Sequence, residues 1–417
     1  MRAIDRAWID CGVSPFFGRA QLAAAGLAGS SKRDAMAGLL FALSTLFLLC
    51  FLHPFVTYPV SLLLIRLCRG RSRIHPLSVT QGESIAVCFC AFNEEGIIEA
   101  KMQNLLELRR RLPSLEILAY IDAATDRTAE LLRLHAPEIK LHVSSQRHGK
   151  TYGMNLLVDM SEAPIVVFTD ANVMLDSAAL TNLLHYFADP SVGCVCGHLI
   201  YTNPTESAMA ATGSLYWRLE EKIKQLETDT GSAMGADGSI FAIRRHLHRQ
   251  APDDIIDDMY VSLSILCDGY RVVRAPDVTA YERALTAPSD EFRRKIRIAC
   301  QAFNVHRLLW TRLRRLDALS LYKYLSHKLL RWLSMCNLVL AAACLVAGLI
   351  AAGLVPLALS LAVLGVIILC HGKRSRLGLM SYLWSIVLAL TATSVGVWLS
   401  LRGEKFQTWA SASTIRR

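Results

Sequence analysis

Acidic side chains follow several apolar segments of this 417-residue chain, at the points where those segments end. Asp122 closes one such segment, Asp170 closes another, and Phe92-Asn93-Glu94-Glu95 follows a third. Carboxylates that lie close together repel one another when ionised, unless a cation or hydrogen-bond donors share the site. The pattern therefore predicts a site for a divalent metal and a ligand that carries phosphate.

Asp170-Ala171-Asn172 is the motif best suited to the metal. Mg²⁺ takes one or two carboxylates together with phosphate oxygens and water. Asp170 could supply the carboxylate, and Asn172 an amide oxygen or a supporting contact. Asn93 and Asp170 are also of the residue types common as helix caps and turn residues, and each of the two taken alone fits that structural role.

A basic segment, Ser145-Gln-Arg147-His148-Gly149-Lys150, opens a predicted helix. A glycine turn and cationic side chains at a helix N-terminus make an anion site. The helix dipole disfavours Lys and Arg at this position, which indicates that an anion is expected there. A solvated basic turn is the alternative interpretation, and the residues alone leave both open.

An acidic cluster, Asp253-Asp254-Ile-Ile-Asp257-Asp258, precedes the helical pattern 259–267. Carboxylates in the first turn of a helix interact favourably with its dipole, which is a purely structural role. A carboxylate held beside a nucleophilic hydroxyl can instead act as a general base. The sequence leaves both interpretations open.

The elements that must position these residues lie between residues 80 and 290, where short apolar runs alternate with helical patterns. This alternation predicts an α/β fold with a mostly parallel sheet and helices on both faces. Ligands bind beyond the carboxyl ends of the strands in such sheets, and the acidic motifs lie there. The expected strands are 84–91, 116–122 and 165–170, and the expected helices are 94–108, 149–160 and 177–187.

The two ends of the chain are apolar. Hydrophobic residues make up 53% of the sequence and charged residues 19%, against about 25% charged residues in an average protein. This composition excludes a disordered chain and a small disulfide scaffold. Residues 36–68 are predicted to form one tilted membrane helix, kinked at Pro54 and Pro59, because about 20 residues suffice to span a bilayer. The block 329–401 is predicted to hold three more spans, at 329–349, 353–370 and 379–401.

Basic residues lie beside the apolar segments and account for much of the net charge of +10. By the positive-inside rule, the arginines of 66–73 and the basic link 371–376 predict that the α/β domain is cytoplasmic. The stretch 291–325 is basic and amphipathic, which suits the headgroup plane, with a solvated helix face as the alternative. Membrane lipids, not nucleic acid, are the predicted partner. The polar segment 1–35 lacks the features of a signal peptide, and 402–417 forms a tail.

In this order the motifs resemble those of the membrane-bound family-2 glycosyltransferases, the group that includes cellulose, chitin, hyaluronan and poly-N-acetylglucosamine synthases. The resemblance covers about residues 35–401. The matching motifs are aromatic-Asn-Glu-Glu at 92–95, a DGSTD-like motif at 122–126, a GK-containing segment at 147–150, a DxD-like motif at 170–172, a glycine-rich acceptor segment at 235–238 and an acidic dyad at 257–258.

The resemblance implies a GT-A type fold and an inverting transfer from a nucleotide-sugar donor, expected to be a UDP-sugar. On the donor side, Asp122 would bind the nucleobase, and Phe92 and Glu94 would line its pocket. Lys150 would hold the donor phosphates. Mg²⁺ or Mn²⁺ would bind at Asp170 and Asn172.

On the acceptor side, the resemblance implies that Asp258, with Asp257 beside it, removes the proton of the attacking hydroxyl. Gly235, Asp237 and Gly238 would line the acceptor site. Arg297 and the metal would stabilise the leaving nucleotide, an electrostatic role that contributes strongly to catalysis.

Two departures from the family pattern affect these expectations. Asn172 replaces the second Asp of DxD, and the QxxRW motif of processive members appears as Arg294-Lys-Ile-Arg297-Ile298, which keeps only the Arg. The expected function is therefore transfer of a hexosyl or N-acetylhexosaminyl group to a lipid-linked or growing glycan. It would occur at the cytoplasmic face of a bacterial-type inner membrane, in exopolysaccharide or glycolipid synthesis, with export partners left open. The alternatives are a processive synthase that extrudes its product and a catalytically degenerate scaffold in a secretion complex.

Overall fold

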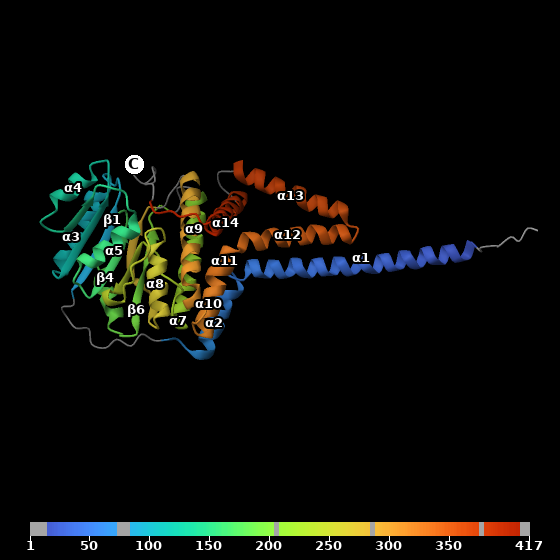
Figure 1. Ribbon diagram of the computed structural model, residues 1–417, viewed down its shortest axis with the longest axis horizontal. Coiled ribbons are helices and arrows are strands. Elements are labelled where there is room, and N and C mark those ends of the chain that lie inside the picture. Colours follow the sequence, from blue (N-terminus) through green and yellow to red (C-terminus); the bar gives the residue numbers. More distant parts are fainter. Residues whose placement is uncertain (1–14, 73–83, 204–207, 284–287, 375–378, 409–417) are drawn as a thin grey trace, which may run out of the picture. The chain divides into compact units, whose positions relative to one another are not determined.

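The computed structural model describes residues 15–72, 84–203, 208–283, 288–374 and 379–408 (Figure 1). The chain divides into two compact units. One contains residues up to 49 together with 337–367, and the other contains residues 50–336 together with those from 368 onward. The second unit holds the α/β domain.

The described residues of the α/β domain form an eight-stranded mixed sheet in the order β3-β2-β1-β4-β7-β6-β8-β5. The pairs β1–β2, β1–β4, β2–β3 and β6–β8 are parallel, whereas β4–β7, β6–β7 and β5–β8 are antiparallel. The predicted α/β class with a mostly parallel sheet is confirmed. The strands are β1 (Ile85–Ala91), β2 (Leu115–Asp122), β3 (Lys140–Ser144), β4 (Ile165–Asp170), β5 (Met174–Leu175), β6 (Val192–Tyr201), β7 (Ile240–Arg244) and β8 (Arg271–Glu282).

Helices cover both faces of this sheet, as Figure 1 shows for α3 and α5. Every residue of β1 is buried, and its side chains alternate between two hydrophobic clusters. Cys88 packs with Met154 of α5 on one face, and Phe89 packs with Met102 of α3 on the other. A strand buried on both faces must be apolar throughout, which explains the continuous run of apolar residues. The helices are α3 (Ile98–Arg111), α4 (Thr128–Leu134), α5 (Lys150–Met160), α6 (Ala179–Phe187), α7 (Ala208–Asp229), α8 (Asp257–Cys267), α9 (Pro288–Leu313) and α10 (Ala318–Tyr324).

The predicted single helix over 36–68 is wrong, because the structure divides it into two. Helix α1 (Pro15–Leu52) ends before a turn at 53–56, and α2 (Thr57–Arg69) follows. Helix α2 packs against α7 through Tyr58, Leu62 and Ile223. It therefore belongs to the unit that holds the sheet, and only residues 32–52 of this region are long and apolar enough to span a bilayer.

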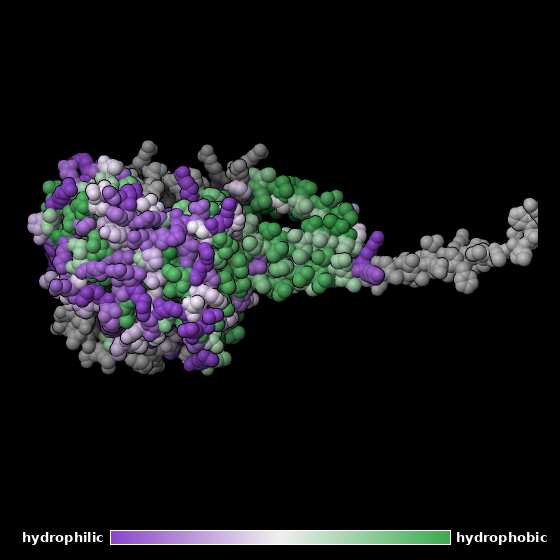
Figure 2. Space-filling view, in the orientation of Figure 1, coloured by the Kyte–Doolittle hydropathy of each residue, from purple (hydrophilic) through white to green (hydrophobic). Residues whose placement is uncertain are grey.

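Among the described residues, four helical segments are long and apolar enough to cross a membrane, one N-terminal and three C-terminal. This confirms the predicted number of apolar helices. Figure 2 shows hydrophobic side chains over α12 (Ser334–Ala351) and α13 (Val355–Arg374). Within the first unit, α1 and α12 approach closely, because the Ser44 hydroxyl donates to the carbonyl of Ala341 at 2.9 Å. Small residues allow such close packing between apolar helices.

The last apolar helix, α14 (Leu379–Leu401), lies along α9 in the unit that holds the sheet. A Cβ atom at Gly396 would lie only 2.5 Å from the carbonyl oxygen of Ile296, so the two backbones touch at this point. Most of the basic stretch predicted at 291–325 forms α9 and α10. Its Leu308 and Trp310 are exposed, and the interfacial role of this stretch stays a prediction.

Candidate active site

The segments that follow β1 and β2 hold one another in place. Asn93 adopts a positive φ of 53°, which Asn tolerates better than most residues. Its side-chain oxygen accepts a hydrogen bond from the backbone N–H of Thr125 at 2.7 Å. The backbone N–H of Glu94 donates to the Thr128 hydroxyl at 2.7 Å. These contacts support the structural interpretation of Asn93 and place Phe92 and Glu94 at the carboxyl edge of the sheet.

Asp122 is completely buried and organises the turn before α5. Its carboxylate accepts hydrogen bonds from Nε of Arg147 at 2.8 Å, from the backbone N–H of His148 at 2.7 Å, and from that of Gly149. Asp122 was expected to bind the nucleobase, but both of its carboxylate oxygens already accept hydrogen bonds from the protein. The accessible surface beside it is the guanidinium of Arg147, which lies 3.4 Å above the ring of Phe92.

Lys150, the first residue of α5, pairs with Asp170 at the end of β4. Its Nζ lies 2.6 Å from the Asp170 carboxylate. Burial alone would lower the pKa of Lys150, but Asp170, with Asp257 and Asp258, raises it above its ordinary value. Lys150 is therefore firmly cationic. Its charge and the N-terminus of α5 both attract an anion.

Asp257 and Asp258 form the buried first turn of α8. Burial raises the pKa of Asp258 to about 7, with Asp257 adding to the rise and Lys150 opposing it. One oxygen of Asp257 is buried without a hydrogen-bond partner. A Cβ atom at Gly238 would lie 3.0 Å from Oδ2 of Asp258 and 3.2 Å from Nζ of Lys150. The glycine therefore allows the predicted acceptor segment, the dyad and Lys150 to meet.

Hydrogen bonds fix α5 relative to the segment that leads into α8. The Thr151 hydroxyl donates to the carbonyl of Ile255 at 2.7 Å, and the Asn155 amide donates to the carbonyl of Ala251 at 2.8 Å. Both contacts are partly or fully buried, where such bonds are costly to lose. The position of the dyad relative to Lys150 is thus set by side-chain hydrogen bonds to backbone carbonyls.

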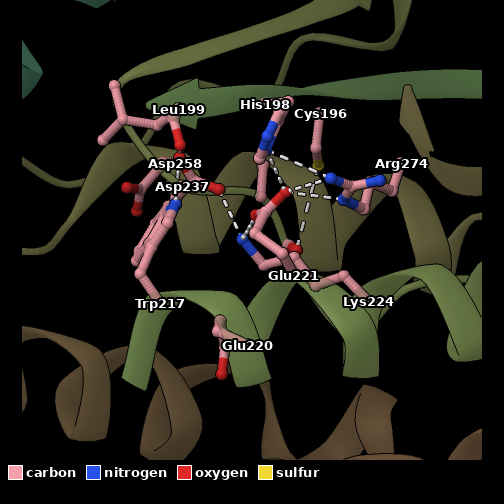
Figure 3. A network of polar contacts seen from close by, with 12 residues as sticks. Cys196, His198, Leu199, Trp217, Glu220, Glu221, Lys224, Asp237, Asp258 and Arg274 are labelled. Carbon is pink, nitrogen blue, oxygen red and sulfur yellow. Dashed lines mark hydrogen bonds and ion pairs between the residues drawn. The ribbon is translucent and has the colours of Figure 1, made fainter. Parts of the chain in front are cut away.

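Lys224 on α7 holds the predicted acceptor residue Asp237 (Figure 3). Its Nζ lies 2.5 Å from the Asp237 carboxylate and 5.0 Å from the centre of the Trp217 ring. The Lys224 side chain is only 3% exposed, and a buried cation requires such partners. No pattern in the sequence marks Lys224, because only the fold brings Asp237 next to it. In Figure 3, Asp237 and Asp258 lie side by side.

Arg297 on α9 faces the same group of carboxylates. It interacts electrostatically with Asp170, Asp257 and Asp258, and its guanidinium donates to the side chain of Gln301 at 3.0 Å. Burial, together with the neighbouring Arg294, lowers the pKa of Arg297 below its ordinary value. The one residue that survives from the processive motif is therefore positioned at the site.

The residues around Asp170 fit a metal ion that receives only part of its ligands from the protein. The Asp170 side chain is 38% exposed, and Asn172 donates from Nδ2 to Oε1 of Glu282 at 2.9 Å. In the described part of the chain, no group of three or more His, Cys, Asp or Glu side chains is arranged to hold a metal. Mg²⁺ and similar ions commonly take one or two protein ligands and complete their shell with phosphate oxygens and water. Asp170 and the Asn172 amide oxygen match that requirement.

Glu282, which sequence analysis did not single out, ends β8 beside this motif. Burial raises its pKa to about 7, with Arg294 opposing the rise and Asp170 adding to it. Glu282 is thus a carboxyl group with a raised pKa beside another carboxylate, Asp170. Such perturbed groups are typical of functional sites.

Part of the predicted tail lies against the donor side of the site. The Gln407 side chain donates to the carbonyl of His148 at 3.1 Å, and Gln301 donates to the carbonyl of Phe406 at 2.6 Å. Lys405 pairs with Asp254 at 2.5 Å. Residues 404–407 therefore contact both the turn before α5 and helix α9, which sequence analysis did not anticipate.

The predicted site residues come together around the start of α5. Asp122 binds the backbone of Gly149, Asp170 pairs with Lys150, and Asp258 lies next to Lys150 across Gly238. A Cβ atom at Gly235 would lie 3.7 Å from the Ser262 hydroxyl on α8. Residues far apart in the sequence thus form one acidic site with embedded cations.

Residues 86–251 match the sequence profile of glycosyl transferase family 2. The matched segment contains most of the α/β domain, from β1 to β7. An N-acetylglucosaminyltransferase of Bradyrhizobium diazoefficiens is 21% identical over 251 residues, which are 56% of this chain and 52% of that protein. The O-antigen chain rhamnosyltransferase RfbN of Salmonella typhimurium is 22% identical over 155 residues, 35% of this chain and 49% of that protein. The chain thus spans about half the length of these curated relatives.

A solved structure confirms the GT-A fold of the α/β domain. The mannosyltransferase PcManGT from Pyrobaculum calidifontis, in complex with GDP-Man and Mn²⁺, superposes with a TM-score of 0.67 at 23% sequence identity. The match covers 88% of this chain and 99% of that one. The likeness extends beyond the segment matched by the family profile and includes most of the chain.

Proposed function

We propose that the protein is an inverting glycosyltransferase that moves a sugar from a nucleotide-sugar to a hydroxyl of a glycan acceptor. The observation that carries the proposal is the cluster around Lys150. One side of this lysine contacts the predicted metal ligand Asp170, and the other lies beside the predicted base Asp258. A cation between a metal ligand and a base is suited to hold a donor diphosphate next to the proton acceptor.

On the donor side, the diphosphate binds at Lys150 and at the N-terminus of α5, where the helix dipole favours negative charge. Phe92 and Arg147 form the flat surface for the nucleobase, and Glu94 borders it. Asp122 acts through Arg147 and Gly149 by holding the turn in shape. Asp170 and Asn172 would hold Mn²⁺ or Mg²⁺, and the ion would supply positive charge beside the leaving diphosphate.

On the acceptor side, Asp258 takes the proton of the attacking hydroxyl. Its raised pKa, about 7, suits a general base at neutral pH. The hydroxyl oxygen forms a bond to the anomeric carbon on the face opposite the nucleotide, and the bond between that carbon and the diphosphate oxygen breaks. The electron pair leaves with the nucleoside diphosphate, whose charge Arg297 helps to stabilise. Asp237 and the glycines beside it border the acceptor.

The membrane role follows from the apolar helices. We infer that these helices anchor the transferase domain at the cytoplasmic face of a bacterial inner membrane, where the acceptor is a lipid-linked or growing glycan. The basic residues beside the spans favour this orientation. The product would then enter polysaccharide or glycolipid synthesis.

The experiment is a donor screen with the detergent-solubilised full chain. UDP-N-acetylglucosamine, UDP-glucose, GDP-mannose and dTDP-rhamnose are supplied with Mn²⁺, and released nucleoside diphosphate is measured. We expect one donor class to be turned over, with loss of at least about 100-fold on metal removal or in Asp170→Ala. The exposed Asp159→Asn on α5 is the matched control and should match the unsubstituted protein.

Two alternatives are distinguished by the same preparation. A processive synthase would yield a ladder of long products after one binding event, whereas single transfer yields one addition. A catalytically degenerate scaffold would neither bind UDP with Mn²⁺ nor release nucleotide from any donor. Either result would replace the proposed single transfer.

A further inference from the structure

The DxD-like motif departs from the family pattern at Asn172, and the structure places an acidic partner against this residue. Nδ2 of Asn172 donates to Oε1 of Glu282 at 2.9 Å. The two residues are 110 positions apart and come from different elements, the turn after β4 and the end of β8. In this contact the NH₂ group of Asn172 is the donor and faces Glu282, and an ionised carboxylate, which can only accept hydrogen bonds, holds it in that orientation.

Both partners are anchored by the backbone. Glu282 lies in register with Tyr201 of β6, and its carbonyl accepts from the backbone N–H of Thr202 at 2.9 Å. The turn that carries Asn172 is held by buried Lys101, whose Nζ donates to the carbonyl of Val173 at 2.5 Å. These contacts fix the backbone positions from which the side chains of Asn172 and Glu282 meet.

An amide has one ligating end and one repelling end. The oxygen can coordinate a cation, whereas the NH₂ group carries positive partial charge and cannot. If Asn172 turned its amide over, it would present the NH₂ group to the ion that Asp170 binds. An aspartate at this position has two equivalent oxygens and needs no such control.

We propose that Glu282 is a positioning residue of the metal site, which locks the Asn172 amide so that its oxygen faces the ion held by Asp170. The pair of Asn172 and Glu282 then replaces the second carboxylate of DxD. The inference rests on the proposed function in that it requires a divalent ion at Asp170. Partners of this kind around a metal ligand typically contribute 10-fold to 100-fold in metal affinity.

The test measures Mn²⁺ binding and needs no turnover. The full chain in detergent is titrated with Mn²⁺ at pH 8 in the presence of saturating UDP, and free Mn²⁺ is followed by its electron paramagnetic resonance signal. Four proteins form a double-mutant cycle: the unsubstituted chain, Glu282→Gln, Asn172→Asp and the double variant. Exposed Glu162→Gln is the matched control for a glutamate-to-glutamine change.

With Asn172 present, Glu282→Gln should weaken Mn²⁺ binding about 10-fold, because glutamine can donate to the Asn172 oxygen and turn the amide over. In the Asn172→Asp background, the same change should cause no loss, since a carboxylate has no wrong orientation. A purely electrostatic role of Glu282 would give a similar loss in both backgrounds, and a purely structural role would lower thermal stability without this dependence on residue 172. Either result would overturn the proposal.

The outcome also separates the inference from the proposed function. If the unsubstituted chain binds UDP but no Mn²⁺, the metal site itself is wrong, and the inference falls with it. If the unsubstituted chain binds Mn²⁺ and all four proteins bind it equally, only the inference about Glu282 is overturned.

Discussion

Asp258 has the environment that a general base needs at neutral pH. It is buried at the start of α8, beside Asp257 and Asp237, and these neighbours and burial outweigh the opposing charge of Lys150. A carboxyl group with an ordinary pKa would be a weak proton acceptor at pH 7, because Brønsted behaviour favours a base whose pKa is near the working pH.

The pH dependence of transfer should report this group. The pKa of Asp258 is raised to about 7, and the base must be ionised to act. The rate should therefore be constant well above pH 7 and fall about tenfold per pH unit well below it. The measurement is kcat/KM for the acceptor between pH 5 and 9. An acid limb near pH 4, where an unperturbed aspartate titrates, would contradict the assignment.

The sequence predicts that the residues at the strand ends lie close together, but it does not predict which partner each of them binds. Asp170, Lys150 and Asp258 follow elements whose ends share one edge of a sheet, so their convergence follows from the alternation of strands and helices. Asp122 was expected to face the nucleobase, yet its oxygens bind Arg147 and the following backbone. Glu282 and Lys224 were missed because their partners are set by antiparallel or helical neighbours that no local pattern encodes.

At the scale of elements, a buried polar network joins α2, α7 and the π-helix η2 (Leu325–Leu329). The Tyr58 hydroxyl donates to Glu227 at 2.6 Å. His327 contacts Glu227 through Nδ1 at 2.7 Å and Glu220 through Nε2 at 2.9 Å. Burial alone would raise the pKa of Glu227, but His327 lowers it below the usual range. The His327 ring therefore bridges two buried carboxylates.

Removing His327 should destabilise this part of the molecule strongly. The variant His327→Ala removes a hydrogen-bond partner from buried Glu220 and from buried Glu227. Leaving a buried polar group without its partner costs about 1–3 kcal/mol, and more for a charged group. Thermal unfolding of the detergent-solubilised chain, followed by tryptophan fluorescence, should show a clearly lower Tm. His185→Ala, at an exposed position on α6, is the control. Equal Tm values for the two variants would mean that the network contributes little.

The same network explains why the first apolar segment was predicted wrongly. Composition alone favours one continuous span over 36–68, because this region has few charges. The structure ends the first helix at Leu52 and packs the second against α7, where Tyr58 finds its buried carboxylate and Arg66 pairs with Asp229 at 3.1 Å. Polar partners supplied by a distant helix cannot be inferred from hydropathy.

At the scale of the whole molecule, composition predicted more than local pattern did. The excess of apolar residues at the two ends corresponds to four apolar helical segments within the described part of the chain, and the alternating middle forms the GT-A domain. Helix α9 links an apolar helix to the α/β domain within one unit. It packs against apolar α14 at Gly396 and carries Arg297 into the site. Membrane anchoring and catalysis are therefore expected to depend on the same helix.

The most direct test of the account separates donor binding from chemistry in Asp258→Asn. The substitution removes the proposed base and keeps the size of the side chain. Binding of UDP with Mn²⁺, measured by calorimetry, should stay within about threefold of the unsubstituted chain, because Asp258 does not contact the donor diphosphate in the proposed mechanism.

Sugar transfer from the donor found in the screen should fall by about 100-fold to 10,000-fold in Asp258→Asn, while Asp159→Asn transfers normally. This pattern would establish that the carboxylate at the start of α8 performs the proton transfer. Transfer at an undiminished rate by Asp258→Asn, with binding intact, would contradict the central claim that the residues around Lys150 form one glycosyl transfer site.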